Sequence, residues 1–243
     1  VGGLRSAMTE AYEGVLWDIG GVIVELESIR EGYAEFVGAF AREHGLDPER
    51  ALEAWKGELG DYFAGTEGSE YRPAREGYVR ATESLLADPP AVEAWWPRFR
   101  EVAAANVRPK PGAVDVIEAL DDAGVYLGVL SDVDTEEALN MFESFGIRGR
   151  FDHVTTSEEV GYRKPDGRMF EAATERLRSA GVDPSRTLMV GDRYRHDVEG
   201  AREAGLVPVG YGTDAHGPAA EYEIRDLREL LDIVGVPGDT DGD

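Results

Sequence analysis

The chain has 243 residues, of which 42% are apolar, and this suits one large domain or a core domain that carries an insertion. Its 49 acidic and 25 basic residues give a formal charge of -24, which disfavours nucleic acid and anionic membranes as partners. It contains no cysteine, no apolar run long enough to cross a membrane and no signal-peptide pattern, so we predict a cytoplasmic protein without disulfides.

The charged residues have an unusual composition. Only three of the 25 basic residues are lysine, and the acids are spread along the chain instead of forming one block. Surfaces that are rich in acids and poor in lysine are typical of proteins from a high-salt cytoplasm, where salt screens their self-repulsion. We therefore predict a halophilic protein, with an acidic protein from a GC-rich genome as the alternative.

The chain begins with a predicted strand that ends in a single acid. Residues 15–26 read VLWDIGGVIVEL, an apolar run interrupted by Asp18 and then by Gly20 and Gly21. From about residue 28 to 105, apolar residues recur at helical spacing and no strand pattern is evident. This change predicts a helical insertion after the first strand. The predicted core comprises residues 11–27 and 106–235, and the helical insertion comprises 28–105. Residues 1–10 and 236–243 are predicted to be flexible termini.

From residue 112 onward, apolar strands alternate with helices. The predicted helices lie at 112–122, at 135–145, after Pro165, up to 205, and at 226–234. The predicted strands lie at 126–130, 153–155, 187–190, 207–209 and close to Ile224. Strands separated by helices pair in parallel through right-handed crossovers. We therefore predict an α/β fold in which helices cover both faces of a parallel sheet.

Polar side chains lie at the ends of these strands. They are Asp18 after the first strand, Ser131 after 126–130, Lys164 before the helix that Pro165 opens, and Asp192 with Asp197 after 187–190. Ligands of open parallel sheets bind at the carboxyl ends of the strands. We therefore expect a carboxylate, a hydroxyl, an ammonium group and an acidic pair to converge on one edge of the sheet.

Three of these residues have both a structural and a functional interpretation. Asp18 could cap a turn, or it could act as a nucleophile that forms a covalent acyl intermediate. Ser131 could cap the next helix. Lys164 favours the functional interpretation, because the chain has so few lysines and a compact ammonium charge suits an anion site.

The remaining motif residues are glycines and acids. Gly20 and Gly21 would let the backbone curl so that its amides face an anion. Asp192 and Asp197 could be solvated surface acids in so acidic a chain. Because they follow a strand and a glycine, they are better interpreted as oxygen ligands for a hard cation such as Mg²⁺.

In this order, the segments resemble the haloacid dehalogenase-like hydrolase superfamily. The resemblance extends from Val15 to about Val234 and implies a Rossmann-like sheet with an active site closed by a cap domain. The helical stretch at 28–105 would form that cap. The segments that carry the resemblance are VLWDIGGVIV at 15–24, GVLSD at 128–132, RKPD at 163–166 and VGDRYRHD at 190–197.

The resemblance implies a Mg²⁺-dependent phosphatase of small phosphorylated metabolites. Asp18 would attack a phosphomonoester and form an aspartyl-phosphate, while Lys164 neutralises developing charge. The implied phosphate-binding set is Ser131, Asp132, Lys164, Gly20 and Gly21. The implied metal ligands are Asp18, Asp192, Asp197 (directly or through water) and the backbone carbonyl of Gly20.

Gly20 departs from the family pattern. Most phosphatases of the family carry a second aspartate two residues after the nucleophile, which protonates the leaving group and then activates water. Gly20 can supply a backbone carbonyl to a metal, but it cannot transfer a proton. Three explanations stay open. The first is a phosphatase that acts on better leaving groups or takes a proton from a cap residue or a metal-bound water. The second is a slow or non-catalytic phosphate binder, and the third is a dehalogenase, whose halide leaves without protonation. Asp132 or Asp134 could replace the missing acid, although we expect them to cap the next helix.

The acidic motif at 191–197 helps to separate these explanations. Dehalogenases of the family need no cation and usually lack this glycine–aspartate motif, whereas the chain keeps Gly191, Asp192 and Asp197. We therefore favour the phosphatase. The sequence identifies neither the substrate, which the cap selects in this family, nor the oligomeric state.

Overall fold

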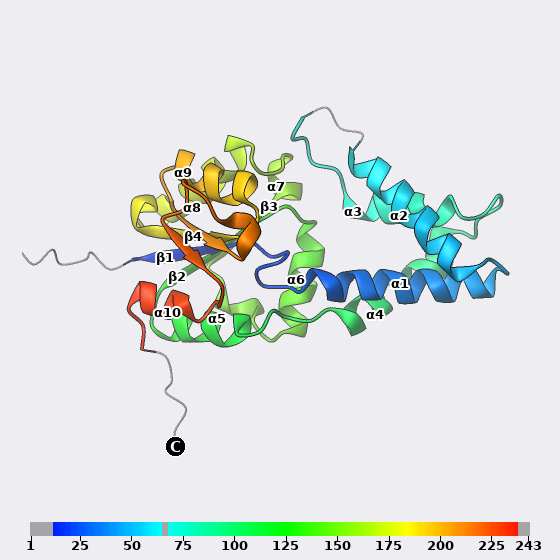
Figure 1. Ribbon diagram of the computed structural model, residues 1–243, viewed down its shortest axis with the longest axis horizontal. Coiled ribbons are helices and arrows are strands. Elements are labelled where there is room, and N and C mark those ends of the chain that lie inside the picture. The colour runs from blue at the N-terminus through cyan, green and yellow to red at the C-terminus, as the bar shows by residue number, and fades with distance from the viewer. Residues whose placement is uncertain (1–11, 65–67, 238–243) are drawn as a thin grey trace, which may run out of the picture.

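A six-stranded sheet, all of whose neighbouring strands pair in parallel, forms the centre of the molecule (Figure 1). The computed structural model describes residues 12–64 and 68–237. The strand order is β3-β2-β1-β4-β5-β6. The strands are β1 (Gly14–Trp17), β2 (Tyr126–Ser131), β3 (His153–Thr156), β4 (Thr187–Gly191), β5 (Val207–Tyr211) and β6 (Tyr222–Ile224). The predicted α/β fold is confirmed.

The central strands are apolar because the sheet is covered on both faces. Val15 and Trp17 of β1 lie in one hydrophobic cluster, and Leu16 between them lies in another. Successive side chains of a strand point to opposite faces, so a strand that is buried on both faces reads as one continuous apolar run. This explains why the strand before Asp18 contains no polar residue.

Helices cover the two faces in separate groups. In Figure 1, α5 and α10 lie below the sheet, and α8 and α9 lie above it. The helices of this part are α5 (Ala113–Asp122), α6 (Thr135–Ser144), α7 (Ser157–Val160), α8 (Gly167–Ser179), α9 (Gly200–Glu203) and α10 (Glu229–Val234). Short helical turns are η1 (Arg148–Arg150), η2 (Pro184–Arg186), the π-type η3 (Tyr194–Glu199) and η4 (Thr213–Ala215). The helix predicted up to residue 205 is observed at 194–203, where the π-type η3 continues directly into α9.

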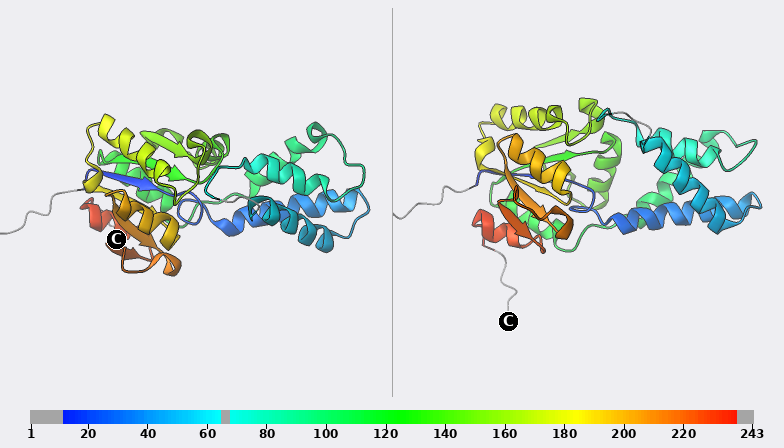
Figure 2. Two further views of the ribbon diagram at one scale, coloured as in Figure 1. Left: turned by 90° about the horizontal axis from the view of Figure 1, so that it is seen from above. Right: turned by 45° about the horizontal axis from the view of Figure 1, so that its top comes forward.

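Four helices extend from one side of the sheet (Figure 2). They are α1 (Leu26–Glu43), α2 (Pro48–Ala64), α3 (Ala74–Glu83) and α4 (Val92–Asn106). They have a hydrophobic cluster of their own, in which aromatic rings predominate: Phe36, Phe40, Trp55, Tyr78, Trp95 and Phe99. Aromatic side chains bury large apolar areas, which helps a small helical unit to form a core.

The helical unit joins the rest of the chain at two adjacent crossings. The N–H of Glu25 donates to the carbonyl of Arg108 at 3.0 Å, and the N–H of Lys110 donates to the carbonyl of Ile23 at 2.8 Å. The predicted domain boundaries at 28 and 105 fall close to these crossings. The predicted flexible termini lie outside the described residues, apart from 236 and 237.

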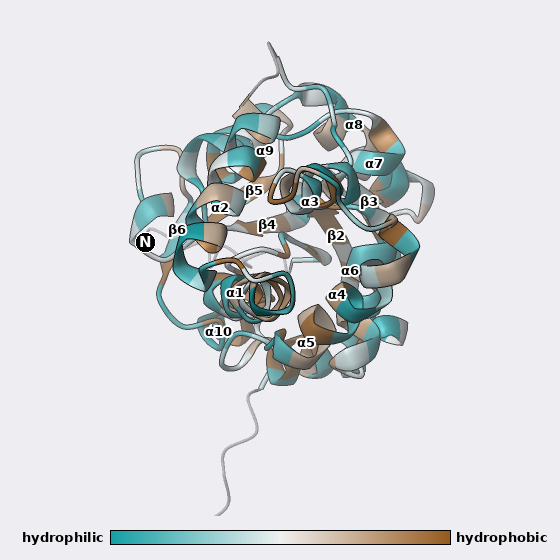
Figure 3. Cartoon of the chain, turned by 90° about the vertical axis from the view of Figure 1, so that its right-hand side faces the viewer, coloured by the Kyte–Doolittle hydropathy of each residue, from teal (hydrophilic) through white to brown (hydrophobic). Residues whose placement is uncertain are grey.

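The hydropathy of the chain follows this arrangement. In Figure 3 the outer rim of helices is largely hydrophilic, and hydrophobic segments concentrate towards the interior. Within residues 12–64 and 68–237, no helix is long and apolar enough to cross a membrane.

Candidate active site

The register of the sheet aligns the ends of three strands. Trp17 pairs with Val129 of β2 and with Val190 of β4, so the carboxyl ends of these three strands lie within two residues of the same level. Asp18 follows directly, and Ser131 and Asp192 lie two residues beyond the paired positions. The predicted convergence on one sheet edge is therefore observed for these residues.

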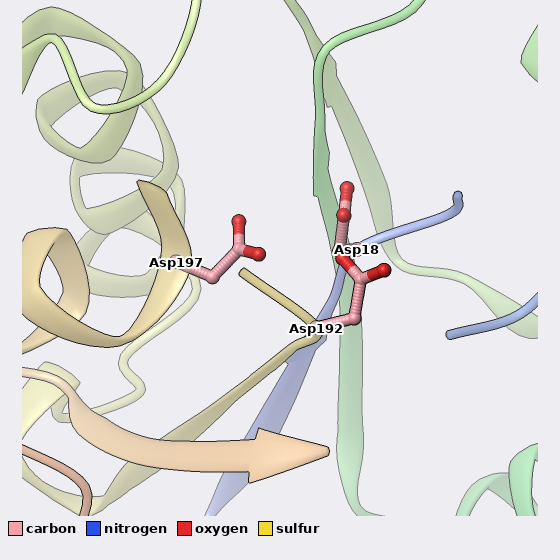
Figure 4. Close-up of side chains that lie close together, drawn as sticks. All are labelled: Asp18, Asp192 and Asp197. Carbon is pink, nitrogen blue, oxygen red and sulfur yellow. The ribbon is translucent and has the colours of Figure 1, made fainter. Parts of the chain in front are cut away.

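Three carboxylates gather at this edge. Asp18, Asp192 and Asp197 each offer one oxygen, and these oxygens all lie within 4.8 Å of one another. Figure 4 shows that Asp18 and Asp192 extend from adjacent strands, whereas Asp197 approaches from the neighbouring helical turn η3. Oxygen ligands at such separations suit one hard divalent cation.

Lys164 lies among these acids and is fully buried. Its Nζ is 3.0 Å from Oδ1 of Asp18 and 2.5 Å from Oδ1 of Asp197, and it donates to the carbonyl oxygen of Leu130 at 3.0 Å. An ammonium group has three donors, so these contacts use its full capacity. The side chain exposes 0% of its surface, and its orientation is therefore determined by the protein.

Burial and charge set the protonation of the three acids. Burial alone would raise the pKa of Asp18, but Lys164, Arg193 and the hydroxyl of Ser131 together lower it below the usual value. Burial, with Asp18 and Asp197 as negative neighbours, raises the pKa of Asp192 to about 6. Burial also raises the pKa of Asp197. Asp18 is thus held as the ionised carboxylate that a nucleophile requires.

Asp197 has a different environment from the other two acids. Its Oδ1 accepts from Lys164 Nζ, and its Oδ2 accepts from the backbone N–H of Arg193 at 2.9 Å. A Cβ at Gly191 would lie 2.1 Å from the Cβ of Asp197, so glycine is required there for this approach. Both oxygens of Asp197 therefore already accept hydrogen bonds from the protein.

The structure corrects the role of Asp132. Its Oδ1 accepts from the backbone N–H of Lys164 at 2.8 Å, and its Oδ2 accepts from the guanidinium of Arg193 at 3.1 Å. Asp132 therefore positions two cationic residues, and its engaged carboxylate is not a phosphate-binding group. The sequence interpretation missed Arg193, although its place directly after Gly191-Asp192 was a usable signal.

Asp134 is not a replacement for the missing acid. It accepts from the hydroxyl of Tyr71 at 2.7 Å and from the backbone N–H groups of Ala74 and Arg75 at 3.0 and 3.4 Å. Asp134 therefore caps α3 of the helical unit, whereas it makes no side-chain cap at α6, where we predicted one. The structure thus ties the helical unit to the segment that follows Ser131.

The two glycines after Asp18 differ in function. Gly21 has a φ of +79°, and a Cβ there would lie 2.0 Å from Oδ2 of Asp192. Its N–H donates to the carbonyl of Val24 at 2.9 Å, so the predicted role of this amide in anion binding is wrong. Gly20 has no positive φ, and a Cβ there would meet only the flexible end of Leu26, at 3.3 Å. The backbone therefore requires glycine at 21 but not at 20.

A cavity of about 340 Å³ extends from Gly20 towards the helical unit. Ser131, Asp132 and Arg193 line it on the side of the sheet. Tyr33, Tyr71 and Tyr78 line it on the side of the helices. Glu137 of α6 lines it as well, and the sequence interpretation missed this residue. The volume suits a small molecule held between the two parts of the chain.

A comparison with protein families decides to which family the chain belongs. A family model described as haloacid dehalogenase-like hydrolase matches residues 12–205. The chain belongs to this family. This confirms the resemblance that the four segments indicate.

Curated relatives of this hydrolase include several phosphatases. Glyceraldehyde 3-phosphate phosphatase of Methanocaldococcus jannaschii is 28% identical over 230 residues, which are 89% of this chain and 97% of that protein. Phosphoglycolate phosphatase of Agrobacterium fabrum is 30% identical over 145 residues, which are 59% of this chain and 60% of that protein.

Solved structures share the fold over nearly the whole chain. A HAD phosphatase from Thermococcus onnurineus is 26% identical with a TM-score of 0.69, covering 93% of this chain and 99% of that one. An L-2-haloacid dehalogenase from Xanthobacter autotrophicus is 16% identical with a TM-score of 0.66, covering 92% and 98%. The fold alone therefore does not separate a phosphatase from a dehalogenase.

Proposed function

We propose that this hydrolase is a Mg²⁺-dependent phosphatase of small phosphomonoesters that acts through an aspartyl-phosphate on Asp18. The observation that carries the proposal is the charge balance of the site. Within the described part of the chain, four carboxylates gather here (Asp18, Asp132, Asp192 and Asp197), and the cations that pair with them are Lys164 and Arg193. A phosphate dianion would be repelled by such an excess of carboxylates, and a bound divalent cation would offset it.

The residues present fit this cation. Asp18 and Asp192 would ligate it directly with the backbone carbonyl of Gly20, and Asp197 would contact it through water. When bound, Mg²⁺ would reduce the repulsion between Asp18 and the phosphate, so that one anion can approach another. Asp18 and Asp197 are buried, so solvent screens their repulsion little and a bound cation would offset more of it.

The protein residues supply attack and orientation. Asp18 is ionised, and its Oδ1 lies against Lys164 Nζ at 3.0 Å, which fixes the direction of the carboxylate. Attack would form a bond between a carboxylate oxygen of Asp18 and phosphorus while the bond from phosphorus to the leaving oxygen breaks. The leaving oxyanion would take its proton from water, and a second water would then hydrolyse the acyl-phosphate. Ser131 and Arg193, which both line the cavity beside Gly20, would bind phosphate oxygens.

The helical unit would act as a cap over this site. Its helices α1 and α3 contribute Tyr33 and Tyr78 to the cavity, so a substrate would lie between the helical unit and the sheet. Such enclosure would limit the access of water to the acyl-phosphate intermediate. The relatives that are named phosphatases support a small phosphorylated metabolite as substrate.

Gly20 limits the expected rate at which the leaving group departs. No side chain is present at this position to protonate the leaving oxygen, and general acid–base help is typically worth about 10²–10⁴-fold. We therefore propose that the enzyme works best on phosphomonoesters with good leaving groups. The alternatives are a slow phosphate binder and a dehalogenase, and both are outcomes of the test below.

The test is a hydrolysis panel in high salt, with and without Mg²⁺, comparing the wild type with Asp18→Asn. Release of phosphate from p-nitrophenyl phosphate and glyceraldehyde 3-phosphate should require Mg²⁺ and should be abolished in Asp18→Asn. Chloride release from 2-chloropropionate without Mg²⁺ would instead establish the dehalogenase. Phosphate binding without turnover of either class would establish the binder.

A further inference from the structure

We propose that Glu137 selects the alcohol part of the substrate, accepting hydrogen bonds from hydroxyl or ammonium groups and rejecting a carboxylate or a second phosphate there. This inference rests on the proposed phosphatase function and specifies its substrate class. Glu137 lies in the first turn of α6 and lines the same cavity as Gly20 and Ser131. It therefore faces the space that the substrate would occupy beyond the phosphate.

The carboxylate of Glu137 is unengaged. Among residues 12–64 and 68–237, no side chain or backbone group donates a hydrogen bond to it, and no cation pairs with it. The other two acids that line the cavity are both occupied, Asp132 by Lys164 and Arg193 and Asp134 by Tyr71 and the start of α3. Glu137 is thus the acid of this cavity, within the described residues, that has acceptor capacity left for a ligand.

The surroundings of Glu137 are aromatic. Tyr33 of α1 and Tyr78 of α3 line the cavity with it, and their hydroxyls hydrogen-bond to each other. The pKa values of both tyrosines are raised, through burial first and the negative charge of Glu137 second. An unpartnered carboxylate in such a setting is unfavourable, and a donor group on a ligand would relieve this.

The protonation of Glu137 agrees with this setting. Burial, with Asp134 as a negative neighbour, raises its pKa to about 7. Holding this carboxylate without a partner lowers the free energy of unfolding of the substrate-free protein, as is common for groups that bind ligands.

The phosphate site and the cavity beside it therefore differ in chemistry. Lys164 and Arg193 provide positive charge beside Asp18, where the phosphate would lie. Glu137 provides a carboxylate to the same cavity as Gly20 and Ser131, which Tyr33, Tyr78 and Arg72 also line. A glycerol-like or an aminoalkyl alcohol would satisfy Glu137, whereas the carboxylate of phosphoglycolate would meet like charge.

The test compares four substrates with three variants. The substrates are glycerol 3-phosphate, phosphoethanolamine, phosphoglycolate and p-nitrophenyl phosphate, and each kcat/KM is divided by that of the same variant on p-nitrophenyl phosphate. The variants are Glu137→Ala, Glu137→Gln and, as a matched control, Glu136→Gln, which removes one charge from the same helical turn. Thermal unfolding at pH 8 shows whether each variant is folded.

We expect Glu137→Ala to lower the normalised kcat/KM for a donor-bearing substrate about 10-fold, mainly through KM, and to raise that for phosphoglycolate. If Glu137 binds hydroxyl groups, the normalised kcat/KM for glycerol 3-phosphate falls in Glu137→Ala and falls less in Glu137→Gln, whose amide oxygen still accepts a hydrogen bond. If Glu137 binds an ammonium group, the normalised kcat/KM for phosphoethanolamine falls in both variants. Glu136→Gln should leave every ratio unchanged, and Glu137→Gln should raise the Tm.

Two results would overturn this inference. Unchanged normalised kcat/KM values in folded Glu137→Ala would show that Glu137 does not contact the substrate. An equal change of these values in Glu136→Gln would show that the loss of any negative charge from this helical turn causes the effect. If the wild type releases no phosphate from p-nitrophenyl phosphate, the proposed function itself fails. The same ratios would then be measured as dissociation constants by calorimetry, and equal affinities in wild type and Glu137→Ala would overturn the selection role as well.

Discussion

Nζ of Lys164 lies 2.5 Å from Oδ1 of Asp197, while the other oxygen of Asp197 accepts from the backbone N–H of Arg193. Asp197 therefore holds the lysine that contacts Asp18, and it also fixes the loop that carries the neighbouring cation. This arrangement makes Asp197 a positioning residue whose effect on Asp18, the proposed nucleophile, passes through Lys164.

Asp197→Asn should lower kcat by about 10- to 100-fold, because the amide cannot hold both the ammonium group and the Arg193 N–H as the carboxylate does. The concentration of Mg²⁺ needed for half-maximal activity should rise less than in Asp192→Asn. Steady-state rates over a Mg²⁺ titration measure both quantities. An equal rise in the two variants would show that Asp197 is a direct ligand.

Lys164→Met should destabilise the protein by about 3–5 kcal/mol, since it leaves the buried carboxylates of Asp18 and Asp197 without their cation. Added Mg²⁺ should restore part of this loss, because it binds only the folded site. Urea unfolding with Mg²⁺ and with a chelator measures the effect. The matched control is Lys56→Met, whose side chain is 53% exposed; a loss of similar size there would contradict the assignment.

Gly20→Asp should accelerate the hydrolysis of poor leaving groups by up to about 10²-fold and leave p-nitrophenyl phosphate less affected. The backbone at Gly20 accepts a side chain, because its φ is not positive and only the end of Leu26 lies near a Cβ. Initial rates on a series of leaving groups of rising pKa test this. A uniform change along the series would show that position 20 does not transfer a proton.

Gly21→Ala is the sterically matched contrast to that substitution. A Cβ at Gly21 would lie 2.0 Å from Oδ2 of Asp192, and the φ of +79° disfavours any side chain there. We expect loss of Mg²⁺-dependent activity together with a lower Tm. An active Gly21→Ala enzyme would mean that Asp192 is free to move without consequence.

His153 should make the protein sensitive to acid. Burial first, and the positive charge of Arg176 second, lower its pKa to about 4, whereas an unfolded histidine titrates near pH 6.5. The neutral ring is thus favoured in the folded state, so its contribution is fully present above about pH 6.5 and is lost as the pH falls towards 4. The loss amounts to about 3 kcal/mol. Unfolding free energies between pH 8 and 4 should show a smaller decrease in His153→Gln, and identical pH profiles would contradict this.

Much of the site could be predicted from the sequence because its residues follow strands. An apolar run that ends in Asp18, and another that ends in Ser131, places both residues at one sheet edge once the strands are known to be parallel. The same reasoning reaches Asp192, and the scarcity of lysine singles out Lys164. The family follows from these motifs in their order, and residues 12–205 match its model.

The sequence determined the order of strands and helices, and with it the carboxylates that share an edge, because those depend on local apolar patterns. Tertiary structure alone decided which partners each side chain finds. Asp134 caps a helix that starts 60 residues earlier in the chain, and Asp132 is occupied by Lys164 and Arg193. Within the described residues, the carboxylate of Glu137 has no hydrogen-bond partner for the same reason: its neighbours Tyr33 and Tyr78 come from distant helices and bond to each other.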